Sequence, residues 1–536
     1  MDVMEKNHGG PDDTGFILRD LYNFFARQKK QRVEGRDADF VLNYLRSKQE
    51  EDSEFFFKYS VDTEGHLKNL FWSDSQSQLD YGAFGDVVVF DSTYRVNRYN
   101  LPFVPFIGVD HHRCTVVFGC GIISDESIAS YVWLLEALLE AMNLKHPDSL
   151  ITDGDAAMAK AIEIVMPRAD HRLCSWHIEQ RMVMHLRGDK LRDFRKFIYH
   201  AMDVDEFERQ WVQFVETHEI RQNDLWIWRM YELRFKWSAA YTKGRKFLGM
   251  QSNQRSESLN SRLHNHLDRL MSLVDLVEHY EFCLLRIRRG QVEHDGRALA
   301  SVPFTEIDDD PFVQRAARIF TPTVFPKVRQ QIQRLAVWEV TEVTWDDDDS
   351  MRFEVACKGN RARLLHVTCA YDGPSLVNAS CRCRMLECEG IPCSHIFTVL
   401  RSLHVDTIPA CCVKVRWTMQ ANSAFPVERV TNTHVWSEQM DRFRALRNHG
   451  NRALFKASRS AEVTGRVMEF FDSILDGDVE NNHSLEEMSF GPLPAYFSAA
   501  NRPSTSRVLN PKKIISKGAP PTNRRLRRFR ENLKRD

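Results

Sequence analysis

The chain has 536 residues, 43% of them hydrophobic, which is enough for roughly three domains with substantial cores. Its net charge of −1 is unevenly distributed, because residues 501–536 contain twelve Lys and Arg against two acids and carry +10, while the rest carries −11. No stretch approaches the ~18 apolar residues of a transmembrane helix, which argues against a membrane protein. Residues 1–14 are polar and do not resemble an export signal, so we expect the twelve cysteines to lie in a reducing compartment.

The first 80 residues predict two short amphipathic helices followed by a β-hairpin. Apolar side chains recur at helical spacing through residues 14–50, in two groups separated by Asp37. The turn sequence Asp62-Thr-Glu-Gly65 then lies between two strand-like segments. These segments are residues 55–59 and 67–72.

Residues 81–290 predict an α/β domain. Three strands, a helix, a strand and a helix follow one another, which is the order of a ribonuclease-H-like fold with its first and fourth strands adjacent at the sheet centre. A long helical stretch, about 177–247, is expected as an insertion packed on this core. The expected strands are 87–90, 103–109, 115–123 and 150–152, and the expected helices are 128–142 and 156–165.

Two of these strands end in aspartates, Asp91 and Asp153, which the expected topology brings together. With Glu257, in the first turn of a predicted helix over 256–270, they form three carboxylates able to hold two divalent cations during in-line displacement at phosphorus. Mg²⁺ is the expected ion because it prefers oxygen ligands. An aspartate at a strand end is also a common turn or capping residue, and Asp155 is best interpreted as a helix cap.

Cys381, Cys383, Cys393 and His395 form a Cys-x-Cys-x9-Cys-x-His motif, a complete ligand set for tetrahedral zinc. Four protein ligands leave no open position, so we expect the Zn²⁺ to be structural rather than catalytic. Cys388 lies inside the loop but breaks the paired spacing, and we interpret it as a spare cysteine.

The remaining regions are assigned from their patterns. Residues 335–425 predict a small β-rich module around the zinc motif, residues 291–334 a connecting helical segment, and residues 426–536 a mostly disordered tail with a basic end. Within the module we expect strands at 335–344, 351–358 and 364–369, an acidic turn at Asp346–Asp349 and a helix at 394–403; within the tail we expect a helix at 463–475.

Two further patterns carry weaker signals. Cys174 and His177 form a Cys-x-x-His pair, which by itself fits a buried cysteine and a packing histidine. The aromatic run from Trp226 to Tyr241 offers rings that stack on nucleobases, although its helical spacing favours a packed core.

Together these motifs resemble a known family. The segment from Cys381 to His395 resembles a SWIM zinc finger. Four upstream segments resemble the successive blocks of a Mutator-like (MULE) transposase. Their order, with the finger downstream, resembles the plant far-red-impaired-response family over residues 15–430; its members are domesticated transposases that serve as nuclear transcription regulators in light signalling. The four blocks are Phe90-Asp-Ser-Thr-Tyr-Arg-Val-Asn97, Ile151-Thr-Asp-Gly-Asp-Ala156, His171-Arg-Leu-Cys-Ser-Trp-His177 and Gln254-Arg-Ser-Glu-Ser-Leu-Asn260.

The resemblance implies roles for particular residues. Asp91, Asp153 and Glu257 fall on the transposase triad, and Cys174 and His177 fall on its Cys-x-x-His signature. The basic end resembles the nuclear-targeting region of the family, and the implied partners are DNA and a homo- or heterodimer of related proteins. The targeting residues would be Lys517, Arg524, Arg525, Arg527 and Arg528.

One departure shapes the functional hypothesis. The family usually begins with a separate zinc-chelating DNA-binding domain, whereas the first cysteine here is Cys114. We therefore expect DNA contact through other parts of the chain or through a dimer partner. The preferred hypothesis is a nuclear zinc-binding transcription regulator of transposase descent that is not an enzyme in its host role. The alternatives are an active Mutator-like transposase and a dimerising interaction protein without DNA binding of its own.

Overall fold

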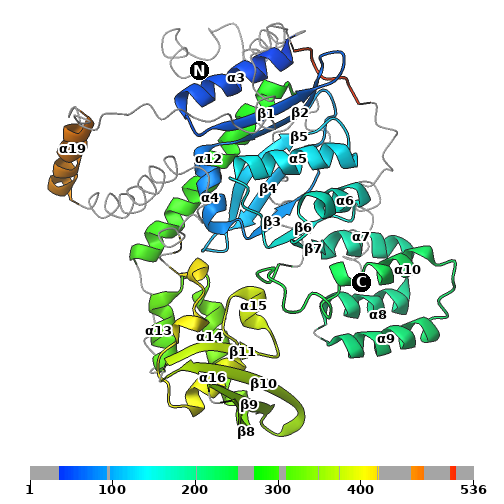
Figure 1. The fold of residues 1–536 in the computed structure, drawn as a ribbon, viewed down its shortest axis with the longest axis vertical. Helices are drawn as coiled ribbons and strands as arrows, with labels where there is room; N and C mark the ends of the chain where they lie inside the picture. The colour runs from blue at the N-terminus through cyan, green and yellow to red at the C-terminus, as the bar shows by residue number, and fades with distance from the viewer. Residues whose placement is uncertain are drawn as a thin grey trace, which may run out of the picture.

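A mixed α/β body with a smaller β-rich module below it and a group of short helices at one side makes up the computed structural model (Figure 1). Several sequence predictions lie outside the described residues: the first helix of 14–50, the helix carrying Glu257, and the basic residues from Lys517 to Arg528. Among the described helices, none has the length and apolarity needed to cross a membrane. The structure describes residues 36–92, 97–200, 202–250, 271–300, 310–347, 349–373, 375–418, 421, 460–475 and 508–514.

The body is built on a seven-stranded sheet with the order β1-β2-β5-β4-β3-β6-β7. Strand β3 pairs in parallel with β6, and β6 with β7, while the other pairs are antiparallel. The expected adjacency of the first and fourth core strands is thereby confirmed. The strands are β1 (Phe56–Val61), β2 (Leu67–Ser73), β3 (Val87–Phe90), β4 (Phe103–Val109), β5 (Thr115–Ile122), β6 (Ser149–Thr152) and β7 (Asp170–Leu173).

Helices cover both faces of the sheet, so the central strands are apolar on both sides. Within β3, Val87 and Val89 pack in one hydrophobic cluster and Val88 and Phe90 in another, as the alternation of a strand requires. The first cluster includes α3 (Asp37–Glu51) and α12 (Leu273–Ala300), and the second includes α4 (Ser75–Phe84), α5 (Ile128–Ala141) and α6 (Ala156–Val165).

The sheet is larger than the sequence predicts. The expected hairpin extends it at one edge, because β2 pairs with β5. Strand β7 extends it at the other edge, although its sequence, Asp-His-Arg-Leu, lacks the apolar run of a central strand. Residues 508–514, expected within a disordered tail, lie against the hairpin: Leu509 N donates to Gly65 O at 2.8 Å, and Leu67 N donates to Leu509 O at 2.9 Å.

The helical insertion forms its own hydrophobic core. Phe194, Phe207, Trp211 and Trp237 are buried together. The aromatic run expected to pack as a core does so in part: Trp237 is buried and Phe235 is exposed, while Trp226, Trp228, Tyr231 and Tyr241 are partly buried against this core. The helices are α7 (Ser175–His185), α8 (Gly188–Tyr199), α9 (Val204–Thr217), α10 (Leu225–Glu232) and the 3-10 turn η2 (Arg234–Lys236).

The β-rich module is a four-stranded antiparallel sheet of order β11-β10-β9-β8, with α16 packed on it. The turn expected at Asp346–Asp349 is confirmed in position, since β8 ends at Asp347 and β9 begins at Ser350, but Asp346 and Asp347 belong to β8. Its elements are β8 (Trp338–Asp347), β9 (Ser350–Cys357), β10 (Asn360–Asp372), β11 (Ser375–Cys381), α15 (Met385–Glu389) and α16 (Ser394–Ser402), preceded by α13 (Pro311–Ile319), α14 (Phe325–Gln333) and η3 (Arg334–Val337); η4 (Ala410–Cys412), η5 (Val415–Trp417) and the separate helix α19 (Ala461–Leu475) follow.

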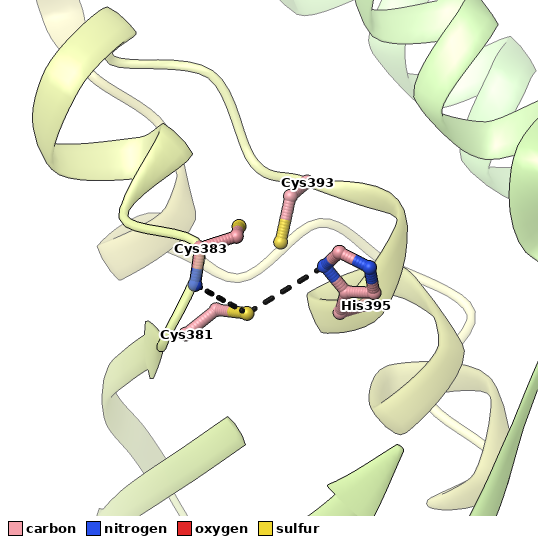
Figure 2. A group of neighbouring side chains, drawn as sticks. All are labelled: Cys381, Cys383, Cys393 and His395. Atoms are coloured by element: carbon pink, nitrogen blue, oxygen red, sulfur yellow. Dashed lines mark hydrogen bonds between the residues drawn. The ribbon is translucent and has the colours of Figure 1, made fainter. Parts of the chain in front are cut away.

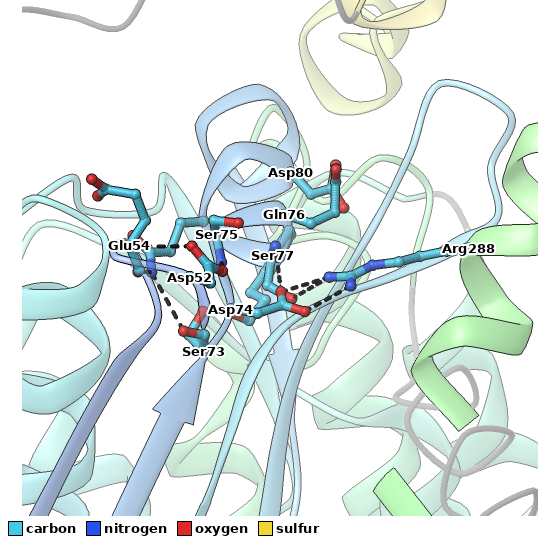
Figure 3. A network of polar contacts seen from close by, with 11 residues as sticks. Asp52, Glu54, Ser73, Asp74, Ser75, Gln76, Ser77, Asp80 and Arg288 are labelled. Atoms are coloured by element: carbon cyan, nitrogen blue, oxygen red, sulfur yellow. Dashed lines mark hydrogen bonds and ion pairs between the residues drawn. The ribbon is translucent and has the colours of Figure 1, made fainter. Parts of the chain in front are cut away.

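A partly buried ion pair ties α12 to the body (Figure 3). Arg288 donates two hydrogen bonds to the carboxylate of Asp74, at 2.7 and 2.6 Å, and a third to Ser77 Oγ at 3.0 Å. Asp74 is also the N-cap of α4, where it accepts from Ser77 N at 2.8 Å. Burial acts to raise the pKa of Asp74, but the bonds and charge of Arg288 outweigh it and lower that pKa.

Arg416 joins the chain after the finger to the sheet. It is 5% exposed, donates to Asp86 Oδ1 at 3.2 Å and to Val109 O at 2.6 Å, and stacks on the rings of Phe84 and Trp417. Burial lowers its pKa, against the opposing charge of Asp86. A charged side chain that far inside needs such partners, so this arginine holds the two sheets in a defined arrangement.

Candidate metal centre and acidic site

Asp91 and Asp153 lie at the same end of two neighbouring parallel strands in the seven-stranded sheet. Asp91 directly follows β3 and Asp153 directly follows β6, and in these parallel neighbours Val89 is opposite Ile151. Each aspartate therefore lies two residues beyond an aligned pair. Asp91 is 8% exposed and Asp153 is half-buried. The sheet thus brings together two acids that are far apart in the chain.

His177 approaches both acids from the first turn of α7. Its Nε2 is 4.0 Å from Asp91 Oδ2. Burial lowers the pKa of His177, the negative charge of Asp153 opposes that effect, and Arg181 adds to it. The imidazole is therefore neutral near pH 7, and its unprotonated ring nitrogen is able to accept a proton or bind a metal.

Cys174 directly follows β7 and is held beside the last residue of β6. Its backbone N donates to Thr152 O at 2.8 Å, and the residue is 1% exposed as the N-cap of α7. The Cys-x-x-His pair is therefore held beside the acids by backbone contacts. In the described part of the chain, however, Cys174, His177 and the two aspartates do not meet as a compact group of three metal-ligand atoms.

The structure distinguishes Asp153 from its neighbour. Asp155 accepts a hydrogen bond from Met158 N at 2.8 Å, which confirms it as the cap of α6. Asp153 Oδ1 in turn accepts from Asp155 N at 3.0 Å. Glu257 lies outside the described residues, so two of the three expected acids are placed.

The four finger ligands converge (Figure 2), and their ligand atoms all lie within 4.8 Å of one another. Cys381 Sγ is 3.6 Å from His395 Nδ1. Ligands of one tetrahedral zinc, bound at about 2.0–2.3 Å, lie roughly 3.3–3.8 Å apart. Cys381, Cys383, Cys393 and His395 therefore fit a zinc ion and would complete its coordination.

The electrostatics of the three thiols also favour a cation. Hydrogen bonds from Cys381 and Cys393 lower the pKa of Cys383 far below its usual range. The reciprocal bonds raise the pKa of Cys381 to about 12 and raise that of Cys393 as well. One thiolate is stabilised at the expense of the other two. Because thiolates are the metal-binding form, a dication would stabilise all three together.

Local structure positions each ligand. Cys381 ends β11, Cys393 is the N-cap of α16, and His395 lies in the first turn of that helix. Between them Arg384, with φ 59°, and Gly390, with φ 73°, bound the short helix α15. The edge of the Trp338 ring faces His395, with the ring centroids 4.3 Å apart.

Gly390 and Cys388 connect the ligand loop to its surroundings. A Cβ at Gly390 would lie 2.7 Å from Trp417 Nε1, which donates to Glu389 O at 2.7 Å, so only glycine fits. Cys388 Sγ accepts a hydrogen bond from Gly244 N at 3.0 Å. It lies outside the ligand group and contacts the end of the insertion, consistent with its interpretation as a spare cysteine.

A groove that sequence reasoning missed lies between the insertion and the finger. It has a volume of about 440 Å³, and its lining includes Arg172, Lys243, Arg245 and Arg382, the last of which is next to Cys383 in the chain. Lys243 and Arg382 are exposed, and two acids, Asp203 and Glu389, also line it. These cations come from three separate segments, so no local pattern in the sequence reveals them.

Comparisons with known proteins agree with these motifs. A family model described as the MULE transposase domain matches residues 87–181, which include β3 to β7 and the start of α7. The chain is 30% identical over 470 residues to Protein FAR1-RELATED SEQUENCE 5 of Arabidopsis thaliana, covering 86% of this chain and 59% of that protein.

Two further Arabidopsis thaliana proteins are similar. Protein FAR-RED IMPAIRED RESPONSE 1 is 28% identical over 78% of this chain and 51% of its own length, and Protein FAR1-RELATED SEQUENCE 9 is 27% identical over 81% and 79%. The chain thus spans between half and three-fifths of the length of several curated relatives it matches. With a transposase-type segment followed by the Cys/His cluster, and with similarity that extends over most of its length, the chain belongs to the plant far-red-impaired-response family.

Proposed function

We propose that this protein is a nuclear, zinc-binding regulator of transcription that descends from a Mutator-like transposase and contacts DNA without cleaving it in its host role. The observation that carries the proposal is the basic groove, since it joins the transposase-type body to the zinc finger and has the charge to bind a phosphate backbone. Descent from a transposase is supported by the parallel pairing of β3 with β6, since these are the first and fourth core strands that a ribonuclease-H-like domain would place side by side.

Within this proposal the finger has a structural role. Zinc held by Cys381, Cys383, Cys393 and His395 would fix the loop that carries Arg382, and thereby one wall of the groove. Lys243 and Arg245, at the end of the insertion, also line the groove. The finger and the insertion would therefore both contact the phosphate backbone of one bound DNA.

The groove is tested by salt-dependent DNA binding of the full chain. The double variant Lys243→Glu and Arg382→Glu should weaken binding at least ten-fold at moderate salt and reduce the slope of log K against log salt by about two, because each lost phosphate contact reduces it by about one. Arg209→Glu, on an exposed arginine of α9 outside the groove, should leave binding nearly unchanged. Equal losses in both variants would reject the groove as the contact surface.

The intact acids favour a second candidate, an active transposase. Asp91 and Asp153 would hold Mg²⁺ together with Glu257, and the metal would activate the attacking oxygen and stabilise the leaving one. Strand cleavage of a DNA duplex is measured with Mg²⁺ or Mn²⁺, comparing the parent chain with Asp153→Asn. Cleavage by the parent that disappears in the variant would overturn the regulator-only proposal.

The third alternative, a dimerising interaction protein, is decided by the same measurements. It requires a chain that self-associates, as seen by light scattering, yet shows no salt-dependent DNA binding. Nuclear location is tested separately by deleting residues 502–536 from a fluorescent fusion. Loss of nuclear accumulation is expected, and unchanged accumulation would reject the basic end as the import signal.

A further inference from the structure

A second group of metal-ligand side chains lies at the other end of the central strands from Asp91 and Asp153. His111 and His112 occupy the turn between β4 and β5, and Asp295 lies on α12. Because β4 is antiparallel to β3, this turn lies where β3 begins, whereas the acids lie where β3 ends. The group is therefore separate from the acidic site, and it shares no residue with the finger.

The ligand atoms of this group point at one another. His111 Nε2 and His112 Nε2 are 2.9 and 2.8 Å from the same oxygen, Asp295 Oδ1. The two imidazole centroids are 4.1 Å apart. Both histidine side chains are almost fully buried, whereas the Asp295 side chain is 37% exposed, so solvent reaches the group from the Asp295 side.

Contacts that do not involve these ligand atoms hold the histidine turn in place. Asp110 Oδ1 accepts hydrogen bonds from His112 N at 2.9 Å and Cys114 N at 2.7 Å, which fixes the turn backbone. The His111 ring stacks on Phe84 at a centroid distance of 5.6 Å. The histidines are thus oriented before any ion arrives.

The α12 side of the group is fixed independently. The Arg288–Asp74 pair anchors α12 two helical turns before Asp295 (Figure 3). Seven residues along a helix return to nearly the same face, so this anchor also sets the direction in which Asp295 projects. Rigid supports on both sides are what a metal site requires of its surroundings.

The charge around the group favours a cation. Asp110 is 1% exposed, and its Oδ2 has no hydrogen-bond partner within the described residues. With Asp295, two carboxylates lie beside the two imidazoles, and these are oxygen and nitrogen donors of the kind that a divalent cation binds.

We propose that His111, His112 and Asp295 bind a divalent transition-metal ion such as Zn²⁺, which cross-links the β4–β5 turn to α12. Two imidazoles and one carboxylate suit zinc and leave a fourth position for water on the exposed side. Ligand atoms on one tetrahedral zinc lie roughly 3.3 Å apart, so each N···O separation must lengthen by about half an ångström. A small rotation of the partly exposed Asp295 side chain accomplishes this.

Cobalt titration of the metal-stripped full chain tests the proposal, because thiolate ligands give Co²⁺ a strong near-ultraviolet charge-transfer band and imidazole or carboxylate ligands do not. We expect two Co²⁺ per chain, only one of which gives that band. Asp295→Asn should weaken the band-less site at least ten-fold and leave the band unchanged. The double variant His111→Asn and His112→Asn should abolish that site.

Matched controls separate this site from non-specific binding and from misfolding. Glu293→Gln, on the same helix and also exposed, should retain two equivalents. If the histidine variant fails to fold, Asp295→Asn still decides, since asparagine keeps the size of the side chain and one oxygen acceptor. A parent chain that binds one Co²⁺, or a second equivalent that persists in Asp295→Asn, would overturn the proposal.

Discussion

The Cys/His cluster of the finger and the acidic site of the large sheet, formed by Asp91, Asp153 and His177, differ in how their residues are brought together. All four members of the Cys/His cluster lie between Cys381 and His395, on one strand end, one loop and one helix start. The acidic site is formed by residues at the ends of β3 and β6 and at the start of α7. The first site depends mainly on local geometry and its ion, and the second on the packing of the whole domain. This difference predicts which perturbations each site withstands.

Metal removal should have the largest effect on stability, and the finger should be the part that unfolds. Chelation or Cys393→Ser should unfold the module around β8 to α16, because structural zinc contributes about 10–16 kcal/mol in finger peptides. Hydrogen exchange should rise across β11 and α16 while β3 and β6 stay protected. Cys388→Ser, outside the ligand group, is the matched control. A module that keeps its protection without zinc would contradict the metal-folding argument.

Replacement of Arg416 should come next and should affect both regions. Arg416→Met removes the charge that faces Asp86 and leaves Val109 O without its donor, at a cost of about 3–5 kcal/mol. Denaturant unfolding is the measurement, with the exposed Lys414→Met as control. Equal stability of the two variants would show that the buried arginine does not hold the sheets together.

Acid should destabilise the large sheet through His171. Burial lowers its pKa from 6.5 to about 3. Between these values the unfolded chain binds a proton that the folded chain does not, so stability is full above pH 6.5 and falls as the pH falls toward 3. The loss from this group should be about 2 kcal/mol between pH 7 and pH 5. The difference in unfolding free energy between the parent and His171→Gln should shrink over this range, and a constant difference would exclude His171 as its source.

The smallest expected effect is a difference in stability loss between substitutions of the neighbouring acids Asp153 and Asp155. Asp155→Ala removes the cap of α6 and should cost about 1 kcal/mol of stability. Asp153→Asn keeps an oxygen acceptor for Asp155 N and should cost less. Thermal unfolding of the two variants makes the comparison. A larger loss for Asp153→Asn would mean that this acid stabilises the sheet instead of serving a binding or catalytic role.

Sequence patterns were reliable where one segment supplies the whole feature. The ligand motif, the cap at Asp155 and the turn between β8 and β9 each occupy few residues and follow local rules of spacing and turn chemistry. Strand β7 and the pairing of β2 with β5 were missed, because a short polar strand and an edge pairing depend on neighbours that are distant in the chain.

By itself, the sequence determined the four residues of the Cys/His cluster, the family and the order of the core elements, since each depends on residue types at short spacing. Tertiary structure alone decided that His177 meets Asp91, that cations from three segments line one groove, and that two buried histidines face an aspartate 184 and 183 residues away. The physical reason is that such contacts follow from sheet order and helix packing, which no local spacing encodes.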